Sequence, residues 1–409
     1  METLALILAG GKGSRLDLLS ARRSKPAMPF AGKFRIIDFT LSNCSNSGIY
    51  DIAILTQYLP LSLNEHIGSG RPWDLDRRDS SVTLLQPHSD WYEGTADAVL
   101  KNLRFVKRRG AKYILILSGD HIYKMNYQKM IDAHKEKGAD LTIATTTVDI
   151  EEASRFGILS MDENKKITSF EEKPAHPKSN QASMGIYVFS ADALYDAIEG
   201  CKETNMDFGK HIIPKMIGDK ERKVFGYPFS GYWQDVGTID SYLETSLELL
   251  HGGKEVLDLY EEGWKIYTRS EEMPPVRIGE DAKIINALIS NGSVIEGTVI
   301  NSILSPGVYV GKGAIVKDSV VFNDTYIGEG AYVENSVLDK KVHVGPHAKI
   351  GFGEVYVKNQ EKPDLLYSGV NVIAKRAVVP ADTIIERNVR VYENAHIVES
   401  RIKSGSTMK

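Results

Sequence analysis

Short apolar runs alternate with amphipathic stretches along the first 250 residues of the chain. The apolar runs predict strands over Leu4–Ala9, Ile52–Thr56, Tyr113–Leu117, Leu141–Thr146 and Gly185–Phe189. Several of these runs are apolar at consecutive positions, which is typical of central strands covered on both faces. The amphipathic stretches predict helices that include Thr95–Arg108, Tyr127–Lys137 and Ile239–Leu250. This alternation favours an α/β fold with a mostly parallel sheet.

A different pattern begins near Ile278. From there to Ile350, apolar residues recur about every five or six positions. The glycines that follow an Ile or Val are spaced by 17 at Gly311, Gly328 and Gly345. This spacing predicts a triangular parallel β-helix, in which stacked coils bury one continuous core of β-branched residues. The polar segment Glu354–Gly369 interrupts the rhythm and is predicted to be a projecting loop.

Turn-forming residues mark the border between the two patterns. His251-Gly252-Gly253 and Pro274-Pro275 bracket a stretch without clear periodicity. We therefore predict a first domain over residues 1–250, a linker over 251–275 and a β-helix domain over 276–409. The length of 409 residues is in keeping with two or three domains.

Composition and charge exclude several classes of protein. Apolar residues make up 42% of the chain and charged residues 25%, as in globular proteins rather than disordered or collagen-like ones. The formal net charge of −4 offers no global attraction to nucleic acid or to an anionic membrane. We find no signal peptide and no apolar run of about 18 residues, so we expect a cytoplasmic protein. Cys44 and Cys201 lack metal-ligand spacing and are expected to be packed thiols.

A glycine-rich loop follows the first predicted strand. Residues 10–16 read Gly-Gly-Lys-Gly-Ser-Arg-Leu, which lets backbone N–H groups approach phosphate oxygens. Leu16 stands where the dinucleotide-binding fingerprint needs a glycine, and the ending typical of a P-loop is absent. A plain structural turn is the alternative. Seven lysines and arginines between Lys12 and Arg35, against Asp17 alone, favour a triphosphate ligand over a solvated basic face.

Two aspartates are candidate ligands of a divalent cation. Asp120 follows the predicted strand Tyr113–Leu117, at the edge where open α/β sheets bind their ligands. Asp235 lies in the turn-rich segment Gly231–Gly237. Mg²⁺ prefers such oxygen ligands, and helix capping is the alternative role for both side chains.

Other polar residues have less specific patterns. His121 could be considered as a general base. A phosphate nucleophile is already largely dianionic at pH 7, however, and has no proton for a base to remove. We therefore expect His121 to be a buried structural histidine. Glu172 and Lys173, which precede Pro174, are candidate contacts for a sugar phosphate. The predicted coils also contain His343 and His347. Since acyltransferases also use such coils, an acyltransferase is an alternative function, and it is the weaker one.

Several motifs belong to one recognisable set that covers nearly the whole chain. They include residues 10–16, Phe34–Phe39, Trp91–Val99, Ser118–Met125 and Gly231–Gly237. This set resembles the glucose-1-phosphate adenylyltransferases of bacterial glycogen synthesis. The segments Phe34–Phe39 and Trp91–Asp97 look specific to the adenylyl branch, which implies ATP as the nucleotide. The resemblance implies a Rossmann-like nucleotidyltransferase domain followed by a left-handed parallel β-helix.

The resemblance also implies roles for individual residues. The triphosphate of ATP would be held by Gly10, Gly11, Gly13, Arg15 and Lys25. The base would be contacted by Gln86, Gly94 and Thr95. Glucose 1-phosphate would be contacted by Tyr92, Gly157, Glu172, Lys173 and Ser183. Mg²⁺ would be held by Asp120 and Asp235, and catalysis would depend on Asp120, Arg15 and Lys173.

Partners and regulation follow from the same resemblance. It implies ATP and glucose 1-phosphate as substrates, phosphorylated allosteric effectors, and a homotetramer or an assembly with a related subunit. Arg22 stands where regulated relatives often carry lysine, and Asn126 replaces an aspartate, which leaves the effector open. Two alternatives remain at this stage: a non-catalytic regulatory subunit, and transfer to the sugar phosphate from another nucleoside triphosphate.

Overall fold

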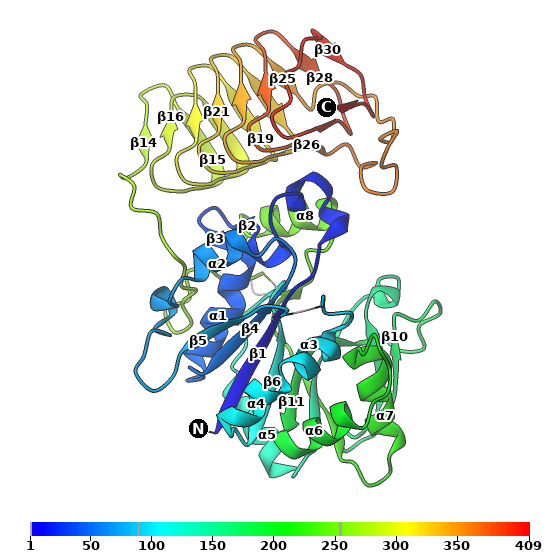
Figure 1. Cartoon of the computed structure of the whole chain (residues 1–409). Coiled ribbons are helices and arrows are strands. Elements are labelled where there is room, and N and C mark those ends of the chain that lie inside the picture. The colour runs from blue at the N-terminus through cyan, green and yellow to red at the C-terminus, as the bar shows by residue number, and fades with distance from the viewer. Residues whose placement is uncertain (1, 89, 253–255) are drawn as a thin grey trace. The chain divides into compact units, whose positions relative to one another are not determined.

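The computed structural model of the chain describes residues 2–88, 90–252 and 256–409 (Figure 1). These residues form two compact units that are interleaved along the sequence. Among the described residues, the first unit consists of residues 2–11, Phe39–Trp233 and Glu262–Tyr267. The second consists of Lys12–Asp38, Gln234–Glu261 and Thr268–Lys409. The domain boundaries at 250 and 276 stay a prediction, and residues 253–255 of the predicted linker lie outside the described residues.

A nine-stranded sheet forms the centre of the first unit (Figure 1). Four neighbouring strands run parallel in the order β6 (Tyr113–Ser118), β1 (Thr3–Ala9), β4 (Ile52–Thr56) and β5 (Val82–Leu85). Strand β11 (Gln181–Ser190) pairs antiparallel with β6 and with β8 (Leu141–Thr147). The remaining strands are β9 (Gly157–Met161), β10 (Ile167–Glu172) and β12 (Val224–Pro228). All five predicted strands are confirmed.

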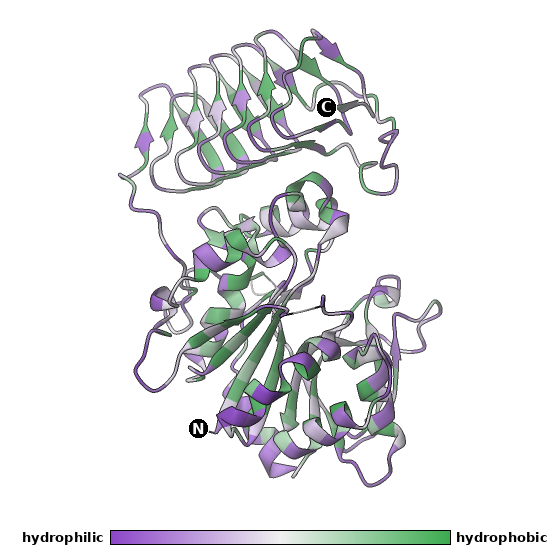
Figure 2. Ribbon diagram, viewed as in Figure 1, coloured by the Kyte–Doolittle hydropathy of each residue, from purple (hydrophilic) through white to green (hydrophobic). Residues whose placement is uncertain are grey.

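Burial explains why the central strands have consecutive apolar residues. Leu4, Ala5, Leu6 and Ile7 of β1 are all fully buried, so both faces of this strand are covered. Figure 2 shows the same sheet as hydrophobic along its strands, with polar residues on the outward sides of the helices. Burial on both faces is the arrangement expected of parallel strands in an α/β unit.

The helices occupy the predicted positions, with one division. Their bounds are α1 (Ile36–Asn46), α2 (Leu61–Ile67), α3 (Thr95–Lys101), α4 (Leu103–Arg109), α5 (Tyr127–Glu136), α6 (Ala191–Glu199), α7 (Ile213–Gly218) and α8 (Ile239–Glu248). Short 3₁₀-helices are η1 (Ser14–Ser20), which is kinked at Asp17, η2 (Lys25–Ala27), η3 (Arg71–Trp73) and η4 (Ala153–Arg155). A short π-helix is η5 (Phe208–Ile212). The predicted helix Thr95–Arg108 is two helices, because Asn102 leaves the helical conformation and its side chain donates to the Ala98 carbonyl at 2.8 Å.

The second unit contains a parallel β-helix with three faces (Figure 1). One face is formed by β14 (Arg277–Ile278), β16 (Val294–Ile295), β18 (Tyr309–Val310), β21 (Tyr326–Ile327), β24 (His343–Val344) and β27 (Val378–Val379). The second contains β15 (Lys283–Ile289), β17 (Thr298–Leu304), β19 (Ile315–Lys317), β22 (Tyr332–Glu334), β25 (Lys349–Ile350), β28 (Ile384–Ile385) and β30 (Arg401–Ile402). The third runs from β17 through β20 (Val320–Val321), β23 (Ser336–Leu338), β26 (Asn371–Ile373), β29 (Arg390–Val391) and β31 (Thr407–Met408). Two further pairs of short strands lie outside the large sheet and the coils: β2 (Pro29–Phe30) with β3 (Phe34–Arg35), and β7 (Ile122–Tyr123) with β13 (Trp233–Gln234).

The predicted coil length is confirmed by the pairing of the strands. Val299, Val316, Val333 and Ile350 are paired in register, and all four are fully buried. In these coils, side chains one coil apart are separated by 17 residues, as in the hydrogen bond from Lys317 to Glu334. The offset is 15 residues between β16 and β18 and 18 residues between β26 and β29. The predicted loop is also confirmed, since no strand occurs in the fully described stretch 351–370.

The basic segment after the glycine loop packs on the coils within the second unit. Arg23 donates two hydrogen bonds to Asp339 at 2.8 and 2.9 Å, and both side chains are buried. The Tyr242 hydroxyl on α8 donates to the Pro29 carbonyl at 2.6 Å, and its ring lies edge-on to Phe322 at 6.1 Å. The segment 12–38 therefore packs against the coils of the β-helix within the second unit.

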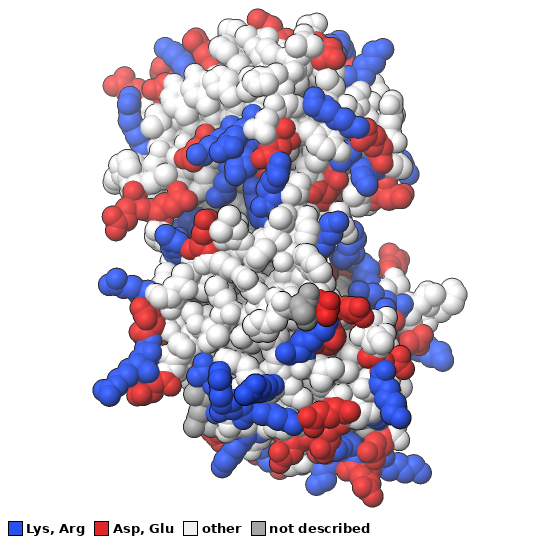
Figure 3. All heavy atoms as spheres, in the orientation of Figure 1, with Lys and Arg blue, Asp and Glu red and all other residues white. Residues whose placement is uncertain are grey.

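Figure 3 shows Lys and Arg interspersed with Asp and Glu on one face of both units, in agreement with the net charge of −4. Within the described stretches, no helix combines the length and the apolar character that crossing a bilayer requires.

Candidate active site

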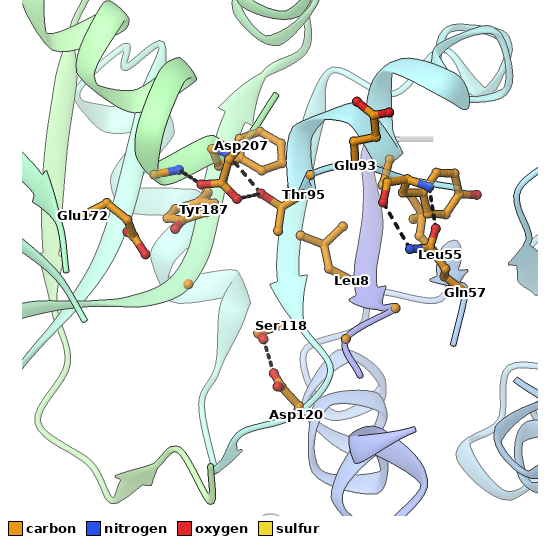
Figure 4. Close-up of a pocket in the computed structure, with 18 residues that line it drawn as sticks. Leu8, Leu55, Gln57, Glu93, Thr95, Ser118, Asp120, Glu172, Tyr187 and Asp207 are labelled. Atoms are coloured by element: carbon orange, nitrogen blue, oxygen red, sulfur yellow. Dashed lines mark hydrogen bonds between the residues drawn. The ribbon is translucent and has the colours of Figure 1, made fainter. Parts of the chain in front are cut away.

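A cavity of about 390 Å³ lies in the first unit at the carboxyl ends of β1, β4 and β6 (Figure 4). Gly10 and Gly11 follow β1, and Gln57 follows β4. Ser118 is the last residue of β6, and Asp120 comes after it. This edge of a parallel sheet is the usual ligand site of α/β folds, and the volume is suited to a small molecule. The cavity is therefore the candidate active site.

One wall of the cavity is fixed by a side-chain clamp. The Gln57 amide donates to the Tyr92 carbonyl at 3.1 Å and accepts from the Tyr92 backbone N–H (Figure 4). The Tyr92 hydroxyl accepts from Asn102 at 3.0 Å, and Asp97 accepts from the Glu93 N–H at 2.9 Å. The loop before α3 therefore has a defined position beside the sheet.

The turn at Gly94 and Thr95 is joined to a distant part of the chain. The Met206 carbonyl accepts from the Ala96 and Asp97 N–H groups at 3.0 and 2.9 Å. A Cβ at residue 94 would overlap this carbonyl, so only glycine allows the close approach. The Thr95 hydroxyl donates to Asp207 at 2.8 Å. Because the Asp207 carboxylate also accepts from the Gly209 N–H, it caps η5 and holds the turn at the same time.

Glu172 enters the cavity from the opposite wall (Figure 4). A Cβ at Gly157 would lie 2.9 Å from Glu172 Oε2, so the missing side chain makes room for the carboxylate. Burial raises the pKa of Glu172 above its usual value, and the Lys173 ammonium, 3.7 Å away, partly offsets that shift. A half-buried carboxylate of this kind is suited to accept hydrogen bonds from sugar hydroxyls.

Ser183 and Tyr187 belong to an irregular part of β11. The pairing of β11 with β8 shifts register between these residues, and Gly185 between them has a φ of 69°. The Ser183 hydroxyl accepts from the Gly185 N–H at 3.2 Å. Burial raises the pKa of Tyr187, whose side chain lines the cavity. The irregularity turns this part of the strand toward the cavity instead of continuing the flat sheet.

Asp120 is placed to bind a cation. It lines the cavity, is partly exposed, and accepts a hydrogen bond from the Ser118 hydroxyl (Figure 4). The lining contains the acidic residues Glu93, Asp120, Glu172 and Asp207, whereas the described lining includes no lysine or arginine. Such a lining repels phosphates unless cations accompany them, so it fits a divalent metal with oxygen ligands. The capping alternative for Asp120 is wrong, because the short strand β7 follows it and Asn126 caps α5.

His121 is less buried than we predicted. Its side chain is 14% exposed, and its ring lies edge-on to Trp233 at 5.2 Å. Nε2 lies 3.6 Å from Asp120 Oδ1, beyond hydrogen-bond distance. The histidine is thus packed on an aromatic ring beside the candidate metal ligand.

Within the second unit, Arg15 and Lys25, two of the predicted triphosphate contacts, both lie beside Asp235. Asp235 forms ion pairs with Lys25 and with Arg15, the latter at 3.9 Å. A Cβ at Gly237 would lie 2.8 Å from Arg15 Nη2, so the guanidinium lies against this glycine. The capping alternative for Asp235 is wrong, since Thr238 caps α8. Asp120 belongs to the first unit and Asp235 to the second, and their joint metal site stays a prediction.

The predicted site residues fall into three groups. The cavity lining contains Gly10, Gly11, Tyr92, Gly94, Thr95, Asp120 and Glu172. Next to Glu172 or to the lining residue Tyr187 are Gly157, Lys173 and Ser183. The second unit contains Gly13, Arg15, Lys25 and Asp235. Gln86 is exposed after β5 and is not among the described lining residues, so its contact with the base stays a prediction.

Sequence reasoning gave no role to Gln57, Asp207 and Tyr187, which also line the cavity. Gln57 follows the predicted strand Ile52–Thr56, so its place after a parallel strand was an available signal. Asp207 offered only the weak signal of an aspartate before a helical turn. Tyr187 lies inside an apolar strand, where only the local irregularity exposes it to the cavity.

The chain is similar to known proteins over nearly its whole length. The family described as nucleotidyl transferase matches residues 4–252, and that described as GlmU-like C-terminal hexapeptide matches residues 274–373. The chain is 50% identical over 413 residues to a glucose-1-phosphate adenylyltransferase of Thermosipho melanesiensis, covering 99% of this chain and 98% of that protein. The chain belongs to the glucose-1-phosphate adenylyltransferase family.

Two further members of the family are similar over most of their length. The protein of Acetivibrio thermocellus is 46% identical over 396 residues, with 95% of this chain and 92% of that protein covered. The protein of Clostridium perfringens strain SM101 is 54% identical over 328 residues, with 78% and 84% covered.

Membership of the glucose-1-phosphate adenylyltransferase family confirms the predicted fold class. The nucleotidyl transferase match covers the sheet and the cavity, and the hexapeptide match covers the coils of the left-handed β-helix as far as β26. Nucleotidyltransferases of this family generally use a divalent metal, which is in keeping with the acidic lining of the cavity.

Proposed function

We propose that this chain transfers the adenylyl group of ATP to glucose 1-phosphate, forming ADP-glucose and pyrophosphate for glycogen synthesis. The observation that carries the proposal is the position of the segments Tyr92–Thr95 and Ser118–Asp120. The first segment lies within Trp91–Asp97, which looks specific to the adenylyl branch, and both segments line one cavity at the ligand-binding edge of the sheet. The two relatives that match over nearly the whole chain are both named glucose-1-phosphate adenylyltransferase.

The reaction is an in-line substitution at phosphorus. A phosphate oxygen of glucose 1-phosphate attacks the α-phosphorus of ATP, and the bond from this phosphorus to the oxygen bridging to the β-phosphorus breaks. Pyrophosphate takes the bonding electrons, and one phosphoanhydride replaces another. The attacking phosphate needs no general base because it is already largely dianionic at neutral pH. The residues of the chain therefore act by orientation and by charge.

We assign the sugar phosphate to the wall that contains Glu172. The Glu172 carboxylate would accept hydrogen bonds from glucose hydroxyls, and the exposed ammonium of Lys173 would bind the phosphate. Tyr92, Gly157 and Ser183 would complete this subsite. Since Glu172 is already partly desolvated, its hydrogen bonds to a sugar are stronger than they would be in water.

We assign the nucleotide to the glycine loop and the clamped turn. Backbone N–H groups of residues 10–13, with Arg15 and Lys25, would hold the triphosphate, and Gly94, Thr95 and Gln86 would meet the base. The clamp between Gln57 and Tyr92 would keep the base-binding turn in place before ATP arrives. A site fixed in advance avoids the entropy that ordering a loop would cost.

We assign Mg²⁺ to Asp120 and Asp235. Asp120 supports this assignment as a partly exposed carboxylate in a cavity whose described lining is acidic. When bound, Mg²⁺ would neutralise phosphate charge in that lining. Ser118 would orient the Asp120 carboxylate through their hydrogen bond.

The experiment that tests the proposal is a nucleotide panel with the purified chain. Glucose 1-phosphate and Mg²⁺ are incubated with ATP, UTP, dTTP or GTP, and both pyrophosphate and the nucleotide sugar are measured. We expect product with ATP. A preference for UTP, dTTP or GTP would favour a transferase that uses another nucleoside triphosphate. Inactivity with all four nucleotides would favour a non-catalytic regulatory subunit. Arg15, Asp120, Lys173 and Asp235 are all present, which supports a catalytic chain. Phosphorylated effectors, a homotetramer and a cytoplasmic location stay predictions.

A further inference from the structure

Asp17 has an unusual backbone conformation in the segment that contains the proposed triphosphate contacts. Its φ is 48° and its ψ is −121°, in a region that glycine adopts far more readily than aspartate. A residue in this conformation persists only where surrounding contacts hold it. Arg15 lies two residues earlier, so the conformation of Asp17 influences how the chain presents Arg15.

A buried arginine of the β-helix binds the Asp17 carboxylate. Arg390 Nε donates to Asp17 Oδ2 at 2.6 Å, and Nη2 donates to Asp17 Oδ1 at 3.0 Å. Nη1 donates to Glu361 Oε2, in the predicted loop, at 3.0 Å. The side chain of Arg390 is 1% exposed and that of Asp17 is 9% exposed. The carboxylates of Asp17 and Glu361 therefore both hold the buried guanidinium.

Local hydrogen bonds join Asp17 to the glycine loop. The Ser20 hydroxyl donates to the Gly13 carbonyl at 2.9 Å and lies 3.1 Å from the Asp17 carbonyl, which it also contacts. The Leu16 N–H donates to the Gly13 carbonyl at 2.9 Å. Residues 13–20 thus form a closed turn, from which the Arg15 side chain extends toward Asp235. A change at Asp17 is transmitted directly to this turn.

The energetics of buried ion pairs favour a geometric role for this pair. The cost of removing two charges from water is comparable to their mutual attraction, so apolar side chains of similar volume are often equally stabilising. A bidentate pair does fix the distance and the angle between its partners. Stability alone therefore does not explain a pair that joins one coil of the β-helix to the strained residue of the loop.

We propose that Arg390 is a positioning residue for ATP. It holds Asp17 in its left-handed conformation and thereby fixes the turn that directs Arg15 to the triphosphate. The inference rests on the proposed function, in which Arg15 contacts ATP. It gives the β-helix a part in nucleotide binding through the coil that contains β29.

The test uses Arg390→Met and Asp17→Asn in the full chain, because each removes the pair from one side. Asp17→Asn leaves Arg390 its bond to Glu361, so it keeps the test valid if Arg390→Met does not fold. We expect KM and the calorimetric Kd for ATP to rise about tenfold or more, and KM for glucose 1-phosphate to change less than about twofold. Arg390→Lys keeps the positive charge but lacks the planar guanidinium that donates two hydrogen bonds to one carboxylate. We therefore expect intermediate values of KM and Kd for ATP.

Arg387→Met is the matched control. Arg387 is also a buried arginine three residues away, and its partner at 2.6 Å is Glu334 of the β-helix. We expect this variant to lower the melting temperature without changing KM for ATP. The inference is overturned if folded Arg390→Met or Asp17→Asn binds ATP like the wild type, or if the control weakens ATP equally. Absence of ADP-glucose from wild type would refute the proposed function instead, while calorimetry would still decide the role of Arg390.

Discussion

The Thr95 hydroxyl at the start of α3 donates a 2.8 Å hydrogen bond to the Asp207 carboxylate at the start of η5 (Figure 4). The two residues are 112 positions apart, and both line the cavity. Asp207 also accepts from the N–H groups of Gly209 and Lys210 at 2.9 and 3.1 Å. One carboxylate thus joins two walls of the candidate active site.

Asp207→Ala should lower stability and weaken substrate binding together. The variant loses the cap of η5, which costs about 1 kcal/mol, and releases the turn at Thr95. Asp207→Asn keeps an oxygen acceptor and should retain most of the melting temperature. Melting curves and KM values of both variants check this. Equal melting temperatures for the wild type and Asp207→Ala would contradict the capping role.

Asp120→Asn should nearly abolish turnover while leaving the melting temperature close to that of the wild type. The substitution removes a charge that holds the metal but keeps the size of the side chain, so we expect kcat to fall by about 10²–10³-fold. Asp132→Asn on the exposed side of α5 is the control and should be fully active. Retained activity in Asp120→Asn would refute the metal-binding role.

Lys173→Ala should weaken glucose 1-phosphate far more than ATP, because Lys173 lies beside Glu172 in the proposed sugar-phosphate subsite. Lys165→Ala is a close control, since Lys165 is also exposed and also has a positive φ, 66° against 50° for Lys173. Steady-state kinetics with each substrate varied in turn measure the effect. An equal loss for both substrates would argue against this subsite.

Glu172→Gln should raise the melting temperature at pH 7 while weakening glucose 1-phosphate. Burial raises the pKa of Glu172 in the folded chain, so the folded state binds more protons than the unfolded state just above pH 4.5. Stability is therefore lost as pH rises through this range, and glutamine removes that loss. The difference between variant and wild type should shrink toward pH 4.5. Glu171→Gln is exposed and should show no such dependence. A constant difference at all pH values would contradict the expectation.

His134 should make the fold sensitive to acid. Burial lowers the pKa of His134 from 6.5 to about 4, and its ring nitrogens hydrogen-bond to Thr142 and Ser190 at 2.8 and 3.1 Å. The unfolded chain binds the proton first, so stability is lost as pH falls from 6.5 to about 4, by about 3 kcal/mol at most. His134→Gln should flatten the melting temperature over this range, whereas the exposed His176→Gln should not. Parallel profiles for wild type and His134→Gln would contradict this.

Local patterns predicted much of the fold because each element has its own periodicity. The consecutive apolar residues of β1 indicated a strand covered on both faces, and the spacing of 17 indicated coils whose buried residues pair in register. Asn102 was the exception, since its side chain competes with the helix for a backbone carbonyl and divides the predicted helix.

The sequence by itself determined the strands, the coil repeat, the glycine loop and the place of Asp120 after a parallel strand, because these depend on neighbours along the chain. Only the tertiary structure decided that Asp207 meets Thr95 and that Arg390 binds Asp17, 373 positions away. Such pairs depend on the path of the backbone between them, and no local periodicity encodes that path. For the same reason, the attachment of residues 12–38 to the β-helix coils was absent from the predicted domain order.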